Sequence, residues 1–291
     1  MKNAIEKATI LSQALPYIQK YNNKIIVVKY GGNAMESEEL KRNVITDIVL
    51  LSEIGIKVVL VHGGGPGIDH ALKAMNKESK FIDGLRYTDE ETMKIVQMVL
   101  SGQTNKDLVV MISAKGYKAV GISGMDAGLI KAKKFKAKQD LGYVGEIIDI
   151  DEKIILDLLD HQYLPVIASV GIDEKNQAYN INADLAAAAI ASKLKAENMV
   201  LVSNIPGLLR DPKDEKSLLS VVYINQIQSL KDTGVIAGGM IPKVDCCINA
   251  IDQGVNKAVI IDGRVPHSLL IEILSDEGIG TMFLEDKNEI I

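Results

Sequence analysis

Two lysines lie where an ammonium group is costly. Lys29 lies inside the apolar run 25–32 (IIVVKYGG), where a buried cation requires an anion or a carboxylate beside it. Lys243 follows the stretch 238–242 (GGMIP), in which Pro242 is predicted as the first position of a helix. A cation in the first helical turn opposes the helix dipole at a cost of about 0.3 kcal/mol or more. Both placements become favourable if a phosphate group lies between the two lysines.

Glycines follow several of the apolar runs and open at least one helix. The clusters are Gly31–Gly32, Gly63–Gly65, Gly207 and Gly238–Gly239. Glycine lets the backbone approach a ligand closely, and helix N-termini offer unpaired N–H groups to anions. One such cluster would be an ordinary tight turn. Four clusters at matching positions predict an anion-rich crevice at one edge of the sheet.

Four further polar residues are candidates for the same crevice. Asp184 opens an alanine-rich segment directly after Asn180-Ile181-Asn182, and the two asparagines add hydrogen-bonding capacity. An aspartate in a first helical turn also simply complements the helix dipole, so its type alone does not decide its role. Arg86 lies just before a predicted helix, where it could form a surface ion pair or grip a carboxylate with two hydrogen bonds.

Several chemistries are excluded by the motifs that the sequence lacks. There is no GxxxxGK[ST] phosphate loop, no GxSxG, and no HExxH or CxxC, and the four histidines are scattered. The HGGGPG stretch does not fit GxGxxG, which disfavours a dinucleotide-dependent oxidoreductase. We therefore expect no metal held by protein ligands. Cys246 and Cys247 are predicted to be buried helix residues.

The elements that must position these residues alternate along the chain. Apolar runs without in/out alternation are typical of parallel strands buried on both faces, and they occur at 25–32, 58–65, 119–124, 164–171, 199–207 and 258–263. Helical patterns cover 37–55, a segment opening at Thr88 with a capping box to Glu91, and 184–194. The alternation predicts an α/β fold, an open αβα sandwich with a mostly parallel central sheet.

Composition places the chain among folded proteins that bind no nucleic acid. Of 291 residues, 47% are hydrophobic and 24% charged, and the net charge of −5 argues against a nucleic-acid surface. No apolar run approaches the roughly 18 residues of a membrane span, and the N-terminus does not resemble a signal peptide. We expect a cytoplasmic protein. The locally basic segment 131–140 is predicted to be a solvated hairpin.

Five blocks together carry a family resemblance. KYGGNAM (29–35), VHGGGPGID (61–69), GLRYTD (84–89), NINAD (180–184) and GGMIPK (238–243) run in order over nearly the whole chain. They resemble the amino-acid kinase family and, within it, the members that act on N-acetyl-L-glutamate. The resemblance implies a sheet shared by two lobes. It also implies ATP-dependent phosphorylation of the side-chain carboxylate of N-acetyl-L-glutamate, a step of arginine biosynthesis that gives an acyl phosphate and ADP.

The resemblance also implies a role for each candidate residue. Lys29 and Lys243 would flank the transferred phosphoryl group, and Asp184 would hold both lysines. The residues expected to bind N-acetyl-L-glutamate are Gly64, Gly65, Arg86 and Asn180, with Arg86 on the α-carboxylate. Those expected at the ATP site are Gly32, Asn204, Gly207, Leu208, Leu209 and Ala237. Mg²⁺ is expected to arrive mainly on the ATP phosphates.

The chain is expected to divide into an N-terminal helix (1–22), an N-lobe for the acid and dimerisation (23–182) and a C-lobe for ATP (183–291). The amphipathic segment 4–21, interrupted at Pro16, and the helix and glycine turn at 267–282 would be packing elements on sequence grounds alone. Their pairing is similar to that in arginine-inhibited hexameric family members. That similarity implies a trimer of dimers and an arginine site with the residues Tyr17, His267, Glu272 and Gly278.

Other functions remain open at this point. A kinase of the same fold could act on an acetylated aminoadipate, carbamate, glutamate or aspartate, although aspartate kinases usually carry added domains. A non-catalytic amino-acid or nucleotide sensor is a second alternative. The joint presence of Lys29, Asp184 and Lys243 argues against it, because binding alone does not need all three.

Overall fold

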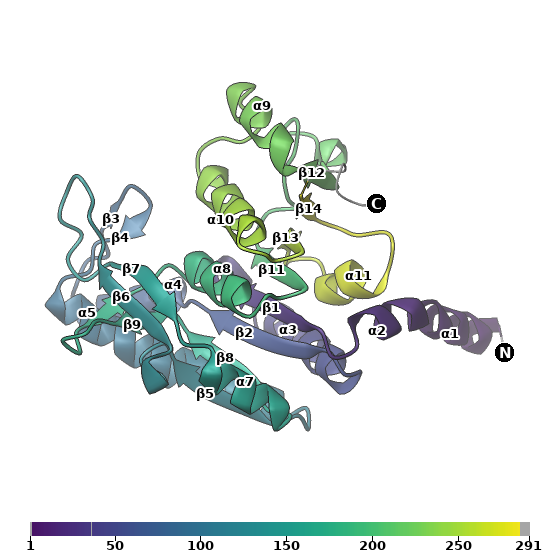
Figure 1. The fold of residues 1–291 in the computed structure, drawn as a ribbon, viewed down its shortest axis with the longest axis horizontal. Helices are drawn as coiled ribbons and strands as arrows, with labels where there is room; N and C mark the ends of the chain where they lie inside the picture. Colours follow the sequence, from purple (N-terminus) through teal and green to yellow (C-terminus); the bar gives the residue numbers. More distant parts are fainter. Residues whose placement is uncertain (1, 36, 286–291) are drawn as a thin grey trace.

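Eight strands form one twisted sheet through the middle of the protein (Figure 1). The computed structural model describes residues 2–35 and 37–285. In spatial order the strands are β12 (Val221–Tyr223), β14 (Thr281–Leu284), β13 (Lys257–Asp262), β11 (Asn198–Ser203), β1 (Ile25–Tyr30), β2 (Lys57–His62), β8 (Leu164–Ala168) and β5 (Ala119–Ser123). Neighbouring strands are parallel except for β13 and β14, which confirms the predicted mostly parallel sheet.

The strand order reverses direction at β1. On one side of β1 lie β2, β8 and the edge strand β5. On its other side lies β11, which follows all of these strands in the sequence. Ligands of open α/β sheets bind beyond the carboxyl ends of the strands at such a switch point. Lys29 and the first glycine pair stand at the carboxyl end of β1, so the topology opens a crevice at these residues.

Helices cover both faces of this sheet (Figure 1). Alternate strand residues serve different faces: Val27 packs toward α8 and α10, whereas Ile26 and Val28 pack toward α3, α6 and α11. The α-helices are α1 (Lys2–Gln13), α2 (Leu15–Tyr21), α3 (Glu38–Glu53), α4 (Gly65–Ala74), α5 (Glu90–Gln97), α6 (Asn105–Ser113), α7 (Lys153–Asp160), α8 (Ala183–Lys193), α9 (Ile227–Asp232), α10 (Met240–Asp252) and α11 (Ser268–Leu274). The shorter helical segments are η1 (Gly32–Met35), the π-helix η2 (Met98–Thr104), η3 (Asp126–Gly128), η4 (Glu215–Ser217) and η5 (Ile224–Gln226).

Two small sheets lie beyond the main one. The larger has the order β10 (Ala178–Asn180), β9 (Val170–Ile172), β6 (Ile130–Lys134) and β7 (Gly145–Ile150). The smaller is a hairpin of β3 (Phe81–Ile82) and β4 (Leu85–Arg86). Strands β6 and β7 pair antiparallel, and Lys131, Lys133 and Lys134 form ion pairs on their exposed surface. The basic segment is therefore the start of a solvated hairpin, as predicted.

The predicted capping box of Thr88 and Glu91 is wrong by one residue. Helix α5 begins at Glu90, and the carboxylate of Asp89 caps it by accepting from the Thr92 N–H at 2.7 Å. The Thr88 hydroxyl is buried and donates to the Arg86 carbonyl at 2.8 Å, so it is turned away from the helix. The same hydroxyl accepts from the Asn180 amide at 3.1 Å, a contact between distant segments that sequence spacing could not reveal.

The predicted start of α10 is also wrong. The helix begins at Met240, so Pro242 is its third residue and not its first. Gly238 adopts a φ of +53°, and the Ala237 and Gly238 carbonyls already accept from Met240 and Ile241 in helix-like turns. The glycine pair therefore starts the helix earlier than Pro242 suggests, and Lys243 lies at the end of the first turn.

The N-terminal segment consists of α1 and α2, separated at Ala14, and Pro16 is the second residue of α2. This confirms the predicted interruption. Within residues 2–35 and 37–285, no helix combines the length and hydropathy that a membrane span requires.

Replacement of Asp89 by alanine tests the observed cap of α5. Asp89→Ala is expected to lower the free energy of unfolding by about 1 kcal/mol, because the Thr92 N–H loses its acceptor. Glu91→Ala removes only an exposed partner of Lys77 and should cost less than about 0.5 kcal/mol. Urea unfolding of both variants measures the difference. A larger loss of unfolding free energy in Glu91→Ala than in Asp89→Ala would support the capping box of Thr88 and Glu91 instead.

Candidate active site

One carboxylate bridges the two lysines that the sequence singles out. The Lys29 Nζ at the end of β1 lies 2.9 Å from Asp184 Oδ1, and the Lys243 Nζ on α10 lies 2.7 Å from Asp184 Oδ2. All three side chains are largely buried, with exposed fractions of 10% for Lys29, 15% for Asp184 and 23% for Lys243. Two ammonium groups share one carboxylate, so the cluster carries net positive charge.

The pKa of Asp184 shows that the two lysines affect this carboxyl more strongly than burial does. Burial would raise the pKa of this carboxyl, but the charges of Lys29 and Lys243 and their hydrogen bonds outweigh burial and hold it at about 2. Asp184 is therefore ionised throughout the neutral range and cannot serve as a general base. It serves instead to orient two cations, which can then attract an anion.

The first turn of α8 fixes the position of Asp184. The Asn182 side chain caps this helix by accepting from the N–H groups of Asp184 and Leu185, at 2.9 and 3.2 Å. At the other side, the Cys246 thiol of α10 donates to the Asp184 carbonyl at 3.0 Å. Cys246 and Cys247 are buried in α10, as predicted. The helix cap and the helix–helix contact together place the carboxylate between the lysines.

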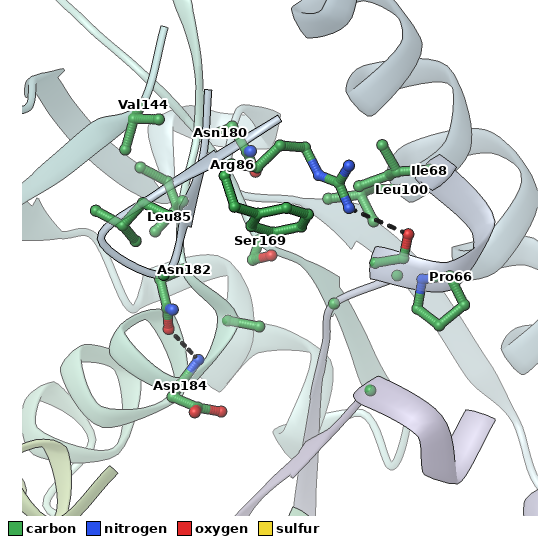
Figure 2. Close-up of a pocket in the computed structure, with 18 of the residues that line it drawn as sticks. Pro66, Ile68, Leu85, Arg86, Leu100, Val144, Ser169, Asn180, Asn182 and Asp184 are labelled. Atoms are coloured by element: carbon green, nitrogen blue, oxygen red, sulfur yellow. Dashed lines mark hydrogen bonds between the residues drawn. The ribbon is translucent and has the colours of Figure 1, made fainter. Parts of the chain in front are cut away.

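A cavity of about 540 Å³ opens beside Lys29 (Figure 2). Its lining includes the predicted residues Lys29, Gly32, Gly64, Gly65, Arg86, Asn180 and Asp184. Figure 2 shows Leu85, Val144, Asn180 and Asn182 along one side and Pro66, Ile68 and Leu100 on the other. The structure thus brings the predicted acid-binding residues and two of the three predicted catalytic residues to one cavity, and Lys243 reaches it through Asp184.

Arg86 is held in place before any ligand binds. Its guanidinium donates to Asp69 Oδ1 at 2.5 Å, to the Ser79 hydroxyl, and to the Gly65 carbonyl at 3.3 Å. It also stacks over the Phe81 ring, with 4.7 Å between the guanidinium carbon and the ring centroid. The arginine is buried and lines the cavity, and it forms an ion pair with the more exposed Asp69, so the ion pair considered from sequence is present.

Sequence analysis missed the residues that hold Arg86. Asp69 lies within the VHGGGPGID block and could have been suspected as the partner of a nearby cation. Ser79 and Phe81 carry no sequence signal: Ser79 lies just before the β3–β4 hairpin, and Phe81 is the cross-strand partner of Arg86 within it.

Asn180 and Gly64 form part of the cavity wall. The Asn180 amide donates to the Thr88 hydroxyl at 3.1 Å, and its backbone N–H donates to the Tyr143 carbonyl at 2.8 Å, which fixes the residue at the end of β10. At Gly64, a Cβ atom would lie 2.6 Å from Leu100 Cδ2. A side chain at this position would therefore displace Leu100, and Gly64 lines the cavity without one.

Of the residues predicted for ATP, Gly32 lines this cavity, whereas the others lie outside it, around the loop after β11 and the turn before α10. Asn204 and Ala237 are exposed, and Gly207 has a φ of +140° with no space for a Cβ atom beside Thr281. Leu208 is buried and its N–H donates to Thr281 Oγ1 at 2.8 Å, while Leu209 pairs with Leu218. Because β11 neighbours β1 and the turn leads into the helix of Lys243, both segments lie on the Lys243 side of the cluster.

The residues predicted for an arginine site lie on and around α11. His267 precedes the helix with a φ of +58°, and its Nδ1 lies 2.6 Å from Asp47 Oδ1 on α3. Glu272 is buried and accepts from the Ile279 N–H at 3.1 Å, next to Gly278 in the left-handed region. Tyr17 on α2 packs against the apolar cluster that contains Leu269 and Ile273 of α11, and α2 contacts α11.

Two buried carboxyl groups around α11, those of Asp47 and Glu272, have raised pKa values. Burial raises the pKa of Asp47 to about 6 although His267 lowers it, and burial likewise raises the pKa of Glu272. Both groups would be stabilised in their charged form by a nearby cation. In the part of the chain that the structure describes, no group of three or more histidine, cysteine, aspartate or glutamate side chains could hold a metal ion.

Removal of the bridging carboxylate should destabilise the protein in a way that an anion reverses. Asp184→Asn leaves two largely buried cations facing each other, and we expect a loss of about 3 kcal/mol in the free energy of unfolding. Inorganic phosphate should raise the melting temperature of this variant more than that of the wild type, because it replaces the missing charge.

The matched control is Asp245→Asn, on the same helix as Lys243. The Asp245 carboxylate lies 2.7 Å from Lys231 Nζ in a more exposed pair, so its loss should cost less than about 1 kcal/mol and confer no phosphate response. Equal losses in the two variants would mean that Asp184 is not the centre of the cluster.

Comparisons with known proteins agree with this geometry. The amino acid kinase family matches residues 24–262 of the chain. The acetylglutamate kinase of Clostridium beijerinckii is 54% identical over 283 residues, which span 97% of this chain and 99% of that protein. The acetylglutamate kinases of Clostridium kluyveri and Brachyspira hyodysenteriae are 55% and 52% identical, over 96% and 97% of this chain and 99% and 98% of theirs.

Solved structures resemble the fold at lower sequence identity. The N-acetylglutamate synthase of Neisseria gonorrhoeae superposes with a TM-score of 0.83 at 24% identity, over 96% of this chain and 63% of that one. The carbamate kinase of Giardia lamblia superposes with a TM-score of 0.67 at 16% identity, over 91% and 99%. These similarities establish the fold, and the family match with the close relatives goes further: the chain belongs to the amino acid kinase family.

Proposed function

We propose that the protein is an acetylglutamate kinase, which transfers the γ-phosphoryl group of ATP to the side-chain carboxylate of N-acetyl-L-glutamate. The products are N-acetyl-L-glutamyl 5-phosphate and ADP, in a step of arginine biosynthesis. Relatives of that name match over almost the whole chain at more than 50% identity. The observation that carries the proposal is the Asp184 carboxylate that bridges two lysines beside a cavity containing a preoriented arginine.

The chemistry requires charge neutralisation and no base. The side-chain carboxyl of a glutamate in water has a pKa of about 4.3, so the acceptor is already an anion at neutral pH. One of its oxygens bonds to the γ-phosphorus while the bond from phosphorus to the bridging oxygen breaks, and ADP leaves with that electron pair. The obstacle is the approach of one anion to another. Lys29, which lines the cavity, stabilises the phosphoryl oxygens from the acid side, and Lys243 stabilises them from the nucleotide side.

The cavity walls orient the acid. The guanidinium of Arg86, fixed by Asp69 and Ser79, binds the α-carboxylate, and the Asn180 amide hydrogen-bonds the acetamido group. The backbone N–H groups of Gly64 and Gly65 lie at the N-terminus of α4, where developing negative charge is favourable. Together these contacts hold the reacting carboxylate beside Lys29.

ATP binds on the opposite side of the lysine cluster. The exposed residue Asn204, the tight turn at Gly207 followed by Leu208 and Leu209, and Ala237 before α10 form this side. Gly32, which borders the cavity with a φ of +72°, lies near the phosphates. Mg²⁺ enters with ATP as part of the substrate and neutralises the phosphates. This arrangement assigns the acid to a lobe of residues 23–182 and ATP to a lobe of residues 183–291.

Arginine acts as a feedback inhibitor in this proposal, and the protein assembles as a trimer of dimers. The support is local. Helix α1 presents exposed apolar side chains at Ile10 and Leu11, which are 60% and 74% exposed and suit an interface with another copy. The buried carboxylates Asp47 and Glu272 near α11 suit a cationic ligand that also contacts Tyr17, His267 and Gly278.

Alanine at either bridged lysine tests the mechanism. Lys29→Ala and Lys243→Ala are each expected to lower kcat by about 100-fold or more, because each removes a cation from the transferred phosphoryl group. ADP release and trapping of the acyl phosphate as its hydroxamate measure turnover, and thermal unfolding checks that the variants fold. Lys193→Ala, at an exposed ion pair of α8, is the matched control and should remain fully active.

Near-normal turnover in a lysine variant would remove that lysine from the mechanism. Turnover of carbamate, glutamate or an acetylated aminoadipate in place of N-acetyl-L-glutamate would keep the phosphoryl-transfer chemistry and overturn the substrate. Tight binding of N-acetyl-L-glutamate without ADP release would favour a sensor.

Deletion of residues 1–20 tests the regulatory part separately. We expect the full chain to be a hexamer that millimolar arginine inhibits, and the truncated protein to be an active dimer that arginine does not inhibit. Light scattering gives the mass and the hydroxamate assay gives the inhibition. A truncated protein that remains hexameric would exclude α1 and α2 as the connecting elements.

A further inference from the structure

His62 is a fully buried titratable residue that the mechanism above does not use. It ends β2 directly before the glycine run of residues 63–65, and its register neighbours are Tyr30 on β1 and Ala168 on β8. Its Nδ1 lies 2.9 Å from the Gly63 carbonyl oxygen, and its Nε2 lies 3.0 Å from Nδ2 of Asn105. A polar ring in this position requires both partners, because an unpaired buried group is costly.

The hydrogen bonds fix the protons of this network. The Asn105 amide nitrogen also lies 2.9 Å from the Val166 carbonyl and 3.2 Å from the Ile122 carbonyl, and both carbonyls can only accept. The nitrogen must therefore face them, and its two protons are shared among these two carbonyls and His62 Nε2. Because the Gly63 carbonyl can also only accept, the imidazole proton lies on Nδ1. The neutral Nδ1–H tautomer donates to the Gly63 carbonyl and leaves Nε2 as an acceptor for Asn105, whereas a second proton would oppose the Asn105 donor.

The electrostatic surroundings agree with a neutral ring. Burial, together with the nearby charge of Lys106, lowers the pKa of His62 to about 4 against the opposing effect of the Gly63 carbonyl. The Lys106 Nζ donates to Asn105 Oδ1 at 3.0 Å and to the Gly121 carbonyl at 2.8 Å. The network thus connects β5 and β8 through Asn105 and the imidazole to the glycine run.

A π-helix brings Asn105 to this place. Asn105 directly follows η2, and its N–H donates to the Leu100 carbonyl five residues earlier, which is the wide turn of a π-helix. The same turn packs Leu100 and Thr104 against Gly64, where a Cβ atom would lie 2.6 Å from Leu100 Cδ2 and 3.2 Å from Thr104 Oγ1. The glycine run is therefore contacted by η2 and hydrogen-bonded by His62.

We propose that His62 and Asn105 are positioning residues that set the orientation of the peptide between Gly63 and Gly64. In a trans peptide the carbonyl and the following N–H point in opposite directions. A Gly63 carbonyl held by the buried imidazole therefore directs the Gly64 N–H away from the ring and toward the cavity that Gly64 lines beside Lys29. This inference rests on the proposed function, in which that N–H stabilises the reacting groups.

Substitutions at His62 separate positioning from packing. His62→Leu removes the donor to Gly63 and should lower kcat by about 30-fold or more, while KM for either substrate changes by less than about threefold. In His62→Asn the side-chain nitrogen takes the place of Nδ1, so at least about tenfold of the lost kcat should return. Asn105→Leu, which frees the ring, should resemble His62→Leu.

A second histidine serves as the matched control. His161 at the end of α7 also places its Nδ1 near a backbone carbonyl, that of Asp157 at 2.8 Å, but it is exposed and remote from the cavity. His161→Leu should leave kcat unchanged. Wild-type kcat in His62→Leu, or a loss that His62→Asn does not restore, would overturn the proposal.

Nuclear magnetic resonance of the imidazole nitrogens in the unmodified protein gives a readout that does not need turnover. The proton of His62 should remain on Nδ1 from pH 5.5 to 9, and the Gly64 amide resonance should move strongly in His62→Leu. A proton on Nε2, or titration within that range, would contradict the network. A wild type that releases no ADP with N-acetyl-L-glutamate would refute the proposed function, and these spectra would still decide whether the ring holds the glycine run.

Discussion

The site depends on one shared carboxylate. Asp184 holds the ammonium groups of Lys29 and Lys243 at 2.9 and 2.7 Å, and without it two cations would face each other in a largely buried place. The three residues come from β1, α8 and α10, which are far apart in sequence. The interaction therefore ties the strand at the centre of the sheet to the helices on one of its faces, and it leaves net positive charge where an anion can bind.

The rest of the fold supports that carboxylate. The alanines of α8 let the helix pack closely on β1, the Asn182 cap fixes its first turn, and the Cys246 thiol joins the Asp184 carbonyl to α10. The strand order changes direction at β1, so the glycine run after β2 faces the same crevice. The same three side chains serve stability and function: they stabilise one another as ion pairs, and with two lysines to one aspartate they keep a net positive charge.

Sequence patterns predicted the features that depend on local composition. The apolar runs predicted the strands of the parallel sheet, and the cost of a lysine in such a run singled out Lys29. Helix boundaries were predicted less accurately: Asp89 caps α5 in place of Thr88, and α10 starts before Pro242. Of the partners of Arg86, only Asp69 could have been suspected, and the network of His62 and Asn105 was not predictable, because contacts between distant segments and a π-helix create it.

A crystal structure with Mg²⁺, ADP, N-acetyl-L-glutamate and aluminium fluoride tests the central claim most directly. Aluminium fluoride is an analogue of the phosphoryl group in the transition state, so its position shows where negative charge develops during the transfer. We expect it within hydrogen-bonding distance of both Lys29 Nζ and Lys243 Nζ, with Asp184 still between the two lysines. Aluminium fluoride bound away from either lysine would contradict the account.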